Sequence, residues 1–267
     1  MAKKLKKKLN GLRRSPKSAI VVLFVALFVV GSGYTAVNAA VSPNRSIMHS
    51  EEQINYGKKL FLANCASCHG RNAEGRDQIA PSLIGVGEAA VDFQVSTGRM
   101  PGAASGPQLQ VKPVQFTEDQ IAAMAAYVGS LGTGPSIPDA AYLQGNGDPQ
   151  KGGELFRINC AMCHNAAGAG GALTEGKYAP NLMGSSAKTI YEAMITGPQN
   201  MPVFNDANIT PAEKNDIITY LQYLQKNRSV GGEELGNLGP VVEGLVAWLG
   251  MLGLIIAITI WLGAKSN

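Results

Sequence analysis

Two apolar segments lie near the two ends of the chain. Residues 19–41 carry no charge and open with an unbroken apolar run, and residues 244–264 are also uncharged. About 20 apolar residues are enough for a helix to cross the hydrocarbon core of a bilayer. The second segment therefore predicts a transmembrane helix. The first predicts either a transmembrane helix or a signal sequence, because the small residues of 37–39 would suit a signal peptidase.

The alternative for residues 244–264 is a helix buried in a protein core. No other segment of the chain is apolar enough to enclose such a helix, which disfavours this alternative. Trp248 and Trp261, near its two ends, suit the two membrane–water interfaces. Gly250 and Gly253 would let a neighbouring helix approach closely, which indicates a partner subunit.

Between these segments, apolar residues recur at helical spacing, and no strand-like alternation of any length is present. Two helices are predicted to begin at Thr117 and Thr210, where Gln120 and Glu213 complete capping boxes. The apolar positions behind the caps are Ile121, Met124, Val128 and Leu131 in the first helix and Ile217, Tyr220, Leu221 and Leu224 in the second. The sequence therefore predicts a mostly α-helical protein.

The region between the apolar segments repeats itself. Residues 57–69 align with residues 152–164, an offset of 95 positions, and later landmarks keep their order. The later matches are residues 81–85 with 180–184, and residues 97–101 with 196–202, which contain two inserted residues. A repeat of this kind predicts two similar domains.

The turn-forming residues give the expected domain boundaries. We expect one domain over residues 50–132 and a second over residues 150–228. Residues 133–149, rich in Gly and Pro, predict a linker between them. Residues 229–243, which are rich in Gly, predict a second linker into the C-terminal helix.

The charge of the chain is unevenly spread. Eight of the 23 Lys and Arg residues lie within residues 1–18, which contain no acid, so 15 bases face 19 acids in the rest of the chain. A basic segment could bind nucleic acid, but an apolar run follows this one directly, and no nucleic-acid partner is expected. The positive-inside rule instead predicts that residues 1–18 and Lys265 face the cytoplasm, with the repeated domains outside the cell membrane. Both termini are then cytoplasmic if the first helix is retained.

Each repeat contains a Cys-x-x-Cys-His motif. The motifs are Cys65, Cys68 and His69 in the first domain and Cys160, Cys163 and His164 in the second. In c-type cytochromes the two thiols of such a motif add to the vinyl groups of haem, and the imidazole ligates the iron. The motifs contain all four cysteines of the chain, so the sequence predicts two covalently bound haem c groups.

Paired cysteines have two other common uses in proteins. A single zinc site is disfavoured because 92 residues separate Cys68 from Cys160 and each pair has its own histidine. A redox-active disulfide would need the strand and helix pattern of a thioredoxin, which the sequence lacks. Haem attachment remains the favoured chemistry.

The other axial position of each iron suits a methionine thioether, a soft ligand that raises the reduction potential. Met100 and Met201 occupy matching Met-Pro sites, 31 and 37 residues after their histidines and shortly before the capped helices. We predict that they are the axial ligands. Met183 and Met194 compete for the second iron, and an isolated Met is often ordinary core.

Other residues near the motifs receive simpler expectations. His49 has no cysteine pair and is expected at the surface. Tyr56, Tyr178, Pro81 and Pro180 are expected to line the haem crevices as packing residues. With both axial positions filled, neither iron would bind peroxide, nitrite or oxygen readily, so the chain is expected to pass electrons at a membrane surface.

The pattern resembles the dihaem cytochrome c subunit of actinobacterial menaquinol:cytochrome c reductases, the cytochrome bc complex. The resemblance covers nearly the whole chain and includes residues 177–181, residues 196–202, the Gly-rich approach to Pro240 and the C-terminal helix. It implies two tandem class I cytochrome c domains. The motif alone identifies only haem c, and the order of modules is the more selective feature.

The resemblance also implies an activity and partners. The complex is a quinol–cytochrome-c reductase, a translocase, whose other subunits are cytochrome b and a Rieske iron–sulfur protein. Electrons would pass from the Rieske protein through the two haems to an aa-type cytochrome c oxidase in a supercomplex. The chain alone would be an electron carrier, with membrane lipid around its helices.

Two alternative functions stay open at this point. One is a dihaem electron-transfer subunit of another membrane respiratory complex, such as a cbb-type oxidase. The dihaem subunit of that oxidase normally has its anchor before the haems and none after them, unlike the helix predicted at residues 244–264. A dihaem peroxidase needs one haem with a vacant or displaceable ligand, which the matched Met-Pro sites disfavour. Carbon monoxide uptake by one reduced haem would favour the peroxidase.

Overall fold

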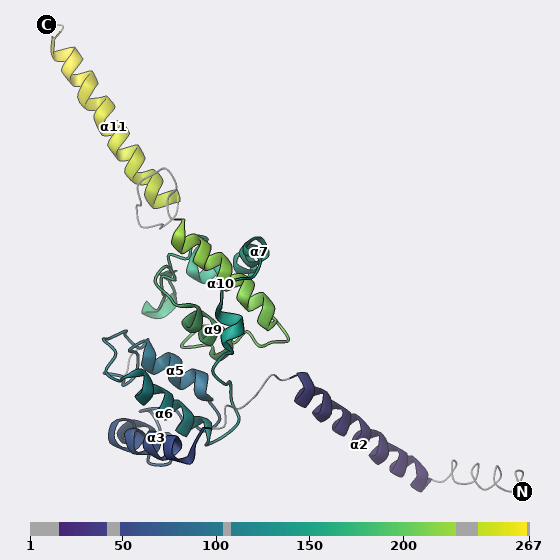
Figure 1. Cartoon of the computed structure of the whole chain (residues 1–267). Coiled ribbons are helices and arrows are strands. Elements are labelled where there is room, and N and C mark those ends of the chain that lie inside the picture. The colour runs from purple at the N-terminus through teal and green to yellow at the C-terminus, as the bar shows by residue number, and fades with distance from the viewer. Residues whose placement is uncertain (1–15, 42–48, 104–107, 228–239, 266–267) are drawn as a thin grey trace, which may run out of the picture. The chain divides into compact units, whose positions relative to one another are not determined.

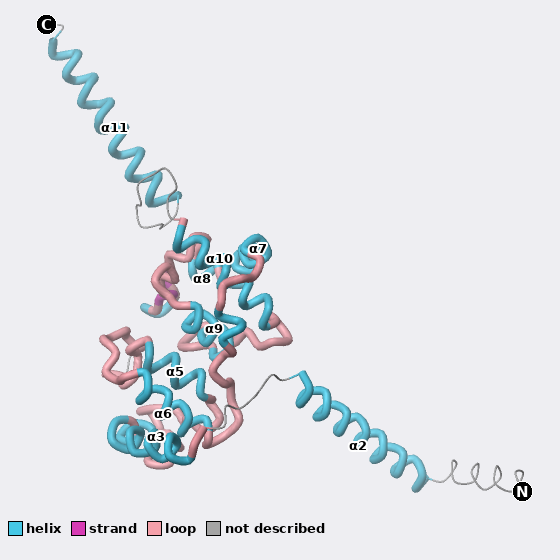
Figure 2. Tube along the Cα trace, in the orientation of Figure 1, coloured by secondary structure: helices cyan, strands magenta, loops and turns pink. Residues whose placement is uncertain are grey.

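The computed structural model describes residues 16–41, 49–103, 108–227 and 240–265 (Figure 1). The chain divides into two compact units, residues 1–48 and 49–267. The described part is mostly helical, as predicted, with two short strands and connecting loops (Figure 2).

The first unit contains helix α2, Pro16–Val41. Over the residues whose side chains the structure describes, its apolar stretch Ile20–Ser32 is exposed. The choice between a membrane anchor and a signal sequence therefore stays a prediction. The basic residues 1–15 lie outside the described part of the chain.

The first repeat folds into helices α3 (Glu51–Asn64), α4 (Ala66–His69), α5 (Glu88–Ser96) and α6 (Glu118–Gly129). Helices α3 and α6 pack closely across each other because Gly57 lies against the backbone carbonyl of Ala123, where any side chain would collide. The rings of Phe61 and Tyr127 pack together at the crossing, with centroids 5.3 Å apart. This crossing forms the core of the first domain.

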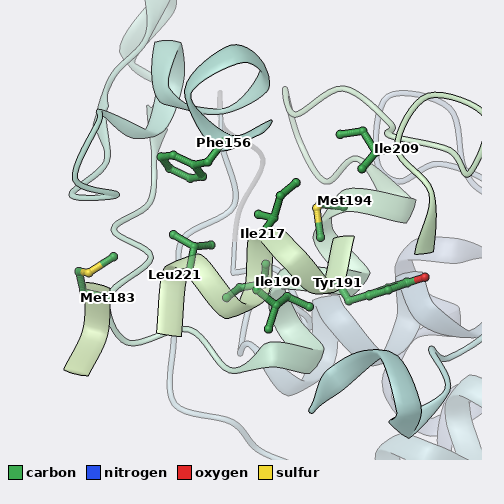
Figure 3. Close-up of a cluster of buried hydrophobic side chains, with 9 residues drawn as sticks. Phe156, Met183, Ile190, Tyr191, Met194, Ile209, Ile217 and Leu221 are labelled. Atoms are coloured by element: carbon green, nitrogen blue, oxygen red, sulfur yellow. The ribbon is translucent and has the colours of Figure 1, made fainter. Parts of the chain in front are cut away.

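The second repeat folds the same way, into α7 (Pro149–Asn159), α8 (Ala161–His164), α9 (Ala187–Thr196) and α10 (Pro211–Lys226). Gly152 lies against the carbonyl of Asp216, and Phe156 packs 5.6 Å from Tyr220 between ring centroids. Figure 3 shows the buried cluster that contains Phe156 of this crossing and Ile190 of α9. The fold thus confirms two similar helical domains.

A small hairpin distinguishes the second domain. Strands β1 (Gly171–Ala172) and β2 (Tyr178–Ala179) pair antiparallel, with the 3-10 turn η2 (Thr174–Gly176) between them. These are the two named strands in the part of the chain that the structure describes. The hairpin leads directly to Pro180, which contacts the second haem motif.

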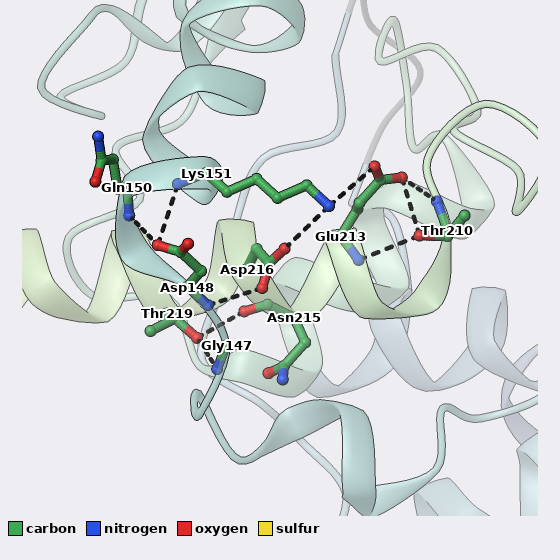
Figure 4. Close-up of polar contacts among 9 residues, drawn as sticks. All are labelled: Gly147, Asp148, Gln150, Lys151, Thr210, Glu213, Asn215, Asp216 and Thr219. Atoms are coloured by element: carbon green, nitrogen blue, oxygen red, sulfur yellow. Dashed lines mark hydrogen bonds and ion pairs between the residues drawn. The ribbon is translucent and has the colours of Figure 1, made fainter.

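Both predicted capping boxes are present. The Thr117 hydroxyl accepts a hydrogen bond from the backbone N–H of Gln120, whose side chain accepts one from the Thr117 N–H. Thr210 and Glu213 make the same exchange at the start of α10 (Figure 4). The helix starts were therefore readable from local sequence.

The segment predicted as the linker between the domains contains structure of its own. Residues 140–143 form the 3-10 turn η1, which Asp139 caps by accepting a hydrogen bond from the backbone of Ala141. Tyr142 stacks on Tyr191 of α9, and Leu143 packs against the same core. Residues 140–143 therefore pack on the second domain, whereas the Pro135 carbonyl accepts a hydrogen bond from the Ala89 N–H of the first at 3.1 Å. The predicted domain bounds stay a prediction. Of the other predicted linker, residues 229–239 lie outside the described part.

Helix α11, Pro240–Lys265, contains the apolar stretch Gly244–Ala264. In the described residues it is the one helix long and apolar enough to cross a membrane, and its side chains are exposed. An exposed apolar surface of this length is unfavourable in water, and its length suits the hydrocarbon core of a bilayer. The predicted C-terminal apolar helix is thus confirmed.

Candidate functional site

The first Cys-x-x-Cys-His motif lies where α3 gives way to α4. Cys65 is the C-cap of α3 and the N-cap of α4, and its carbonyl accepts hydrogen bonds from the backbone N–H groups of Cys68, at 3.1 Å, and His69, at 2.9 Å. This single helical turn gathers two thiols and one imidazole within five residues. Cys68 is exposed and Cys65 half-buried, so both thiols border an accessible face of the domain.

The imidazole of His69 is oriented by a backbone carbonyl. Its Nδ1 lies 2.8 Å from the Pro81 oxygen, and the ring is buried. Because a carbonyl oxygen only accepts hydrogen bonds, Nδ1 carries the proton and Nε2 keeps its lone pair. A histidine held in this tautomer is prepared to bind a metal through Nε2.

The second motif repeats this arrangement. The Cys160 carbonyl accepts hydrogen bonds from Cys163 and His164, and His164 Nδ1 donates to the Pro180 oxygen at 3.0 Å. Burial lowers the pKa of His164, while the bond to Pro180 acts in the opposite direction. The net effect favours the neutral imidazole, the form that ligates iron.

These two carbonyl contacts were missed from the sequence. Pro81 and Pro180 were expected only as packing residues, yet their oxygens orient the two histidines. The available signal is their matching position in the repeat.

The thiols are unlike those of a redox-active pair. Burial, followed by the neighbouring thiol, raises the pKa of Cys65 to about 11 and that of Cys160 to about 11. Reactive Cys-x-x-Cys pairs instead have a lowered thiol pKa. The raised thiol pKa values therefore disfavour the redox-active disulfide.

A shared zinc site is also disfavoured. Among the residues that the structure describes, no group of three or more His, Cys, Asp or Glu side chains is arranged to hold a metal ion. Cys65 packs against the clusters of the first domain and Cys160 against the cluster of the second. The two cysteine pairs thus serve separate sites.

Met100 borders the same cluster as the first motif. It packs with Cys65 around the buried residues Val95, Ile121 and Met124, and its backbone N–H donates to the Gln94 carbonyl at 2.9 Å. The loop that follows is tied back, because the Lys112 N–H donates to Gly98 and its ammonium donates to the Pro101 oxygen. The position of Met100 is therefore fixed by backbone contacts.

Met201 has the equivalent place in the second domain. It packs on the cluster that Cys160 also borders, and its N–H donates to the Pro198 carbonyl at 3.0 Å. Its competitors are core residues: Met194 is 2% exposed and Met183 is 8% exposed within that cluster. Met183 lies at the cluster edge next to Leu221 (Figure 3). The assignment of Met100 and Met201 as axial ligands stays a prediction.

The expectation that His49 lies at the surface was wrong. Its side chain is 11% exposed, with Nε2 3.1 Å from a carboxylate oxygen of Glu88 and Nδ1 3.2 Å from Gln53. His49 directly precedes Ser50, the N-cap of α3, and its side chain reaches Glu88 at the start of α5. His49 therefore joins two helices of the first domain.

The residues present fit haem c. Each domain offers two thiols on one helical turn, an imidazole with its Nε2 lone pair available, and a thioether on the same cluster. This is the donor set by which a haem is tethered and its iron held on both sides. A hollow along residues 74–82, next to the carbonyl that orients His69, adds space beside the first motif.

Comparison with known families gives the same answer for both repeats. Residues 54–132 match the model described as cytochrome c. Residues 147–221 match the model described as cytochrome c oxidase, cbb3-type, subunit III. The chain therefore contains two cytochrome c domains, which bind two haem c groups covalently.

Whole-chain relatives are more specific. A protein of Mycobacterium bovis named cytochrome bc1 complex cytochrome c subunit is 43% identical over 92% of this chain and 90% of its own length. Proteins of the same name from Corynebacterium diphtheriae and Corynebacterium efficiens are 40% and 41% identical, over 97% and 99% of this chain and 99% and 94% of their own lengths. The order of modules and the C-terminal helix agree with these full-length matches, and the chain belongs to the family of cytochrome c subunits of the bacterial cytochrome bc1 complex.

Proposed function

We propose that this chain carries electrons between two membrane complexes as the dihaem subunit of a quinol–cytochrome-c reductase. The observation that carries the proposal is the pair of matched sites in one compact unit, joined to an apolar helix of membrane length. When bound, each haem supplies reversible one-electron chemistry. The chain's part is to tether the two groups and hold them at fixed positions.

The side chains divide this work. Cys65, Cys68, Cys160 and Cys163 form the thioether bonds. His69 and His164 would bind the iron of each haem through Nε2, since Nδ1 donates to a proline carbonyl. Met100 and Met201 would be the second protein ligands. Two protein ligands on each iron would favour electron transfer over reaction with small molecules.

The partners follow from the family. The relatives' names place them in a cytochrome bc1 complex. We propose that a Rieske iron–sulfur subunit donates to one haem of this chain, that a cytochrome b subunit contacts its membrane helix, and that an aa-type cytochrome c oxidase accepts from the other haem. The haem domains lie on the extracytoplasmic face of the cell membrane, with both termini cytoplasmic if α2 is retained.

The match of residues 147–221 to a cbb3-type oxidase subunit gives a second candidate function, that of a subunit of such an oxidase. A relative of that type from Sinorhizobium medicae is 30% identical but covers only 44% of this chain. The full-length matches to bc1-complex subunits therefore favour the reductase.

Purification in mild detergent tests the proposal. Cytochrome b, a Rieske protein and an aa-type oxidase are expected to co-purify with the full-length chain, and pyridine haemochrome analysis is expected to give two tethered haems per chain. Co-purification with a cbb-type oxidase core would overturn the assignment to the reductase. Carbon monoxide binding to the reduced wild-type protein would overturn the closed-site relay and favour a peroxidase.

A further inference from the structure

Three charged side chains meet where the two haem domains touch. Asp92 lies on α5 of the first domain, and Lys188 and Glu192 lie on α9 of the second. The two helices face each other in Figure 1 and are in contact. Lys188 Nζ is 2.7 Å from Asp92 Oδ2 and 3.9 Å from Glu192 Oε1.

The carboxyl groups in this contact are withdrawn from water. Glu192 is 1% exposed and Asp92 is 4% exposed, whereas Lys188 reaches the surface. Neither carboxyl oxygen of Glu192 receives a hydrogen bond. If both acids were ionised, two buried negative charges would share one cation that is already engaged by Asp92. Such an arrangement is unfavourable, because a buried charge requires a partner of its own.

One bound proton removes the excess negative charge of the two carboxylates. A protonated Glu192 becomes a hydrogen-bond donor, and Asp92 is the acceptor within reach. The site then holds a neutral acid, one carboxylate and one ammonium, with no net charge. Burial and the nearby Asp92 raise the pKa of Glu192 to about 9, against the smaller opposing effect of Lys188.

Other charged and titratable groups on the packed elements have partners elsewhere. Their contacts are Glu88 of α5 with His49, Arg99 after α5 with the Phe93 ring, Lys214 of α10 with Asp206, and Tyr142 of η1 with Tyr191 of α9. Lys188 is therefore the cation that the described structure offers to the two acids.

We propose that Glu192 and Asp92 form a proton-binding site that clasps the two haem domains together, and that loss of the proton loosens the clasp. The inference concerns the contact between the domains and does not depend on which respiratory complex the chain serves. Uncharged groups make further contacts at this seam: Gln108 exchanges two hydrogen bonds with the backbone of Tyr178, at 2.9 and 2.7 Å, and the Leu109 N–H donates to the Gln199 side chain at 3.3 Å.

The direction of the effect follows from proton linkage. The closed contact holds a proton that an opened, solvated Glu192 would release near its ordinary pKa of 4.5. Closure is therefore fully favoured below that pH and weakens as the pH rises, until Glu192 ionises in the closed form near 9. Within this window, one linked proton raises the opening equilibrium by about tenfold per pH unit.

Infrared spectroscopy of the full-length dihaem protein in detergent tests the proton directly. At pH 7 we expect a carbonyl band of a protonated carboxylic acid that shifts in D2O and is absent from the Glu192→Gln variant. The control variant Glu154→Gln changes an exposed glutamate of α7 and is expected to keep the band. If the wild type shows no band that disappears in Glu192→Gln, the proposal is overturned.

Hydrogen–deuterium exchange tests the clasp. After correction for intrinsic exchange, protection of α5 and α9 relative to α3 is expected to fall as the pH rises from 6 to 9 in the wild type and in Glu154→Gln, and to stay constant in Glu192→Gln. If Glu192→Gln does not fold, Asp92→Asn takes its place in the experiment. In Asp92→Asn, Glu192 pairs with Lys188 and ionises at lower pH, so the fall in protection moves to lower pH. An unchanged pH response in either folded variant overturns the proposal.

Discussion

The two haem domains share one helix crossing but stabilise it differently. In the first domain α3 and α6 meet through apolar contacts around Phe61 and Tyr127. In the second, α7 and α10 meet through the equivalent ring pair and also through charges, because Lys151 lies 3.3 Å from Glu213 and 3.7 Å from Asp216 (Figure 4). A crossing is set by small residues at its closest point, and its charge environment can then vary between copies.

The second domain also buries charge that the first does not match at the equivalent position. Lys214 of α10 is fully buried, where its ammonium donates to Asp206 at 2.7 Å and to the Ile209 carbonyl at 2.6 Å. Ile121, four residues after the Thr117 cap as Lys214 is after the Thr210 cap, is apolar and buried instead. The second domain is therefore expected to be the more sensitive of the two to loss of a single polar partner.

The largest expected effect comes from the predicted axial methionines. Met100→Ala and Met201→Ala should each open one iron, so that the reduced protein binds about one carbon monoxide per chain, measured by optical titration. Met194→Ala is the matched control, because this core residue should weaken packing without opening an iron. Equal uptake by all three variants, or none by the first two, would contradict the ligand assignment.

The shared crossing can be broken in each domain. Gly57→Ala and Gly152→Ala place a methyl group against a backbone carbonyl, and each should destabilise its own domain by about 3 kcal/mol. Domain-resolved hydrogen exchange measures the two free energies of unfolding. Gly184→Ala, where the added group meets no neighbour, is the control. If either alanine variant is as stable as the wild type, the two helices can move apart at that crossing without loss of stability.

The buried charge provides a contrast between the domains. Lys214→Met should destabilise the second domain by about 2 kcal/mol, because the Ile209 carbonyl would remain buried without its donor. Lys226→Met, at the exposed end of the same helix, should change stability little. Thermal unfolding followed by circular dichroism gives both values. Equal stability of the two variants would show that the Lys214 contacts contribute nothing net.

The smallest expected effect concerns the surface charges of α7 and α10. Hydrogen bonds from the Thr210 backbone, then its hydroxyl, and then from Lys151 lower the pKa of Glu213. The stability this carboxylate adds is therefore present at neutral pH and lost as the pH falls below its ordinary value of 4.5. Lys151→Met should remove about 0.5 kcal/mol at low salt and less at high salt.

Denaturant unfolding of Lys151→Met and the wild type at two salt concentrations checks this prediction. Lys177→Met is the comparison, because its ion pair with Glu175 lies in the β1–β2 hairpin rather than between helices. An effect of Lys151→Met that does not change with salt would assign the loss to packing of the lysine stem.

Local sequence predicted the helices, their caps and the haem motifs, because each depends on residues within one or two helical turns. The Thr117 and Thr210 caps are of this kind. Contacts that close over longer loops could not be read in the same way. The Pro81 oxygen reaches His69 across 12 residues, and nothing in the composition of that loop indicates its path.

Buried charge was likewise beyond the sequence rules. Lys and Glu are ordinarily placed in water, so Glu192 and Lys214 were not expected in a core. His49 was expected at the surface because it has no cysteine pair, and its partner Glu88 lies 39 positions away. Only the packing of α5, α9 and α10 makes these positions buried, and packing depends on the whole chain.

The contact between Gln108 and Tyr178 limits how freely the two repeats can be treated as modules. Gln108 follows the Met-Pro site of one repeat, and Tyr178 stands two residues before the proline that orients the histidine of the other. Leu109 makes a similar bond to Gln199, two residues before Met201. An engineered swap of one repeat for a foreign cytochrome would therefore disturb its neighbour, and the duplicated halves have become mutually dependent in spite of their common plan.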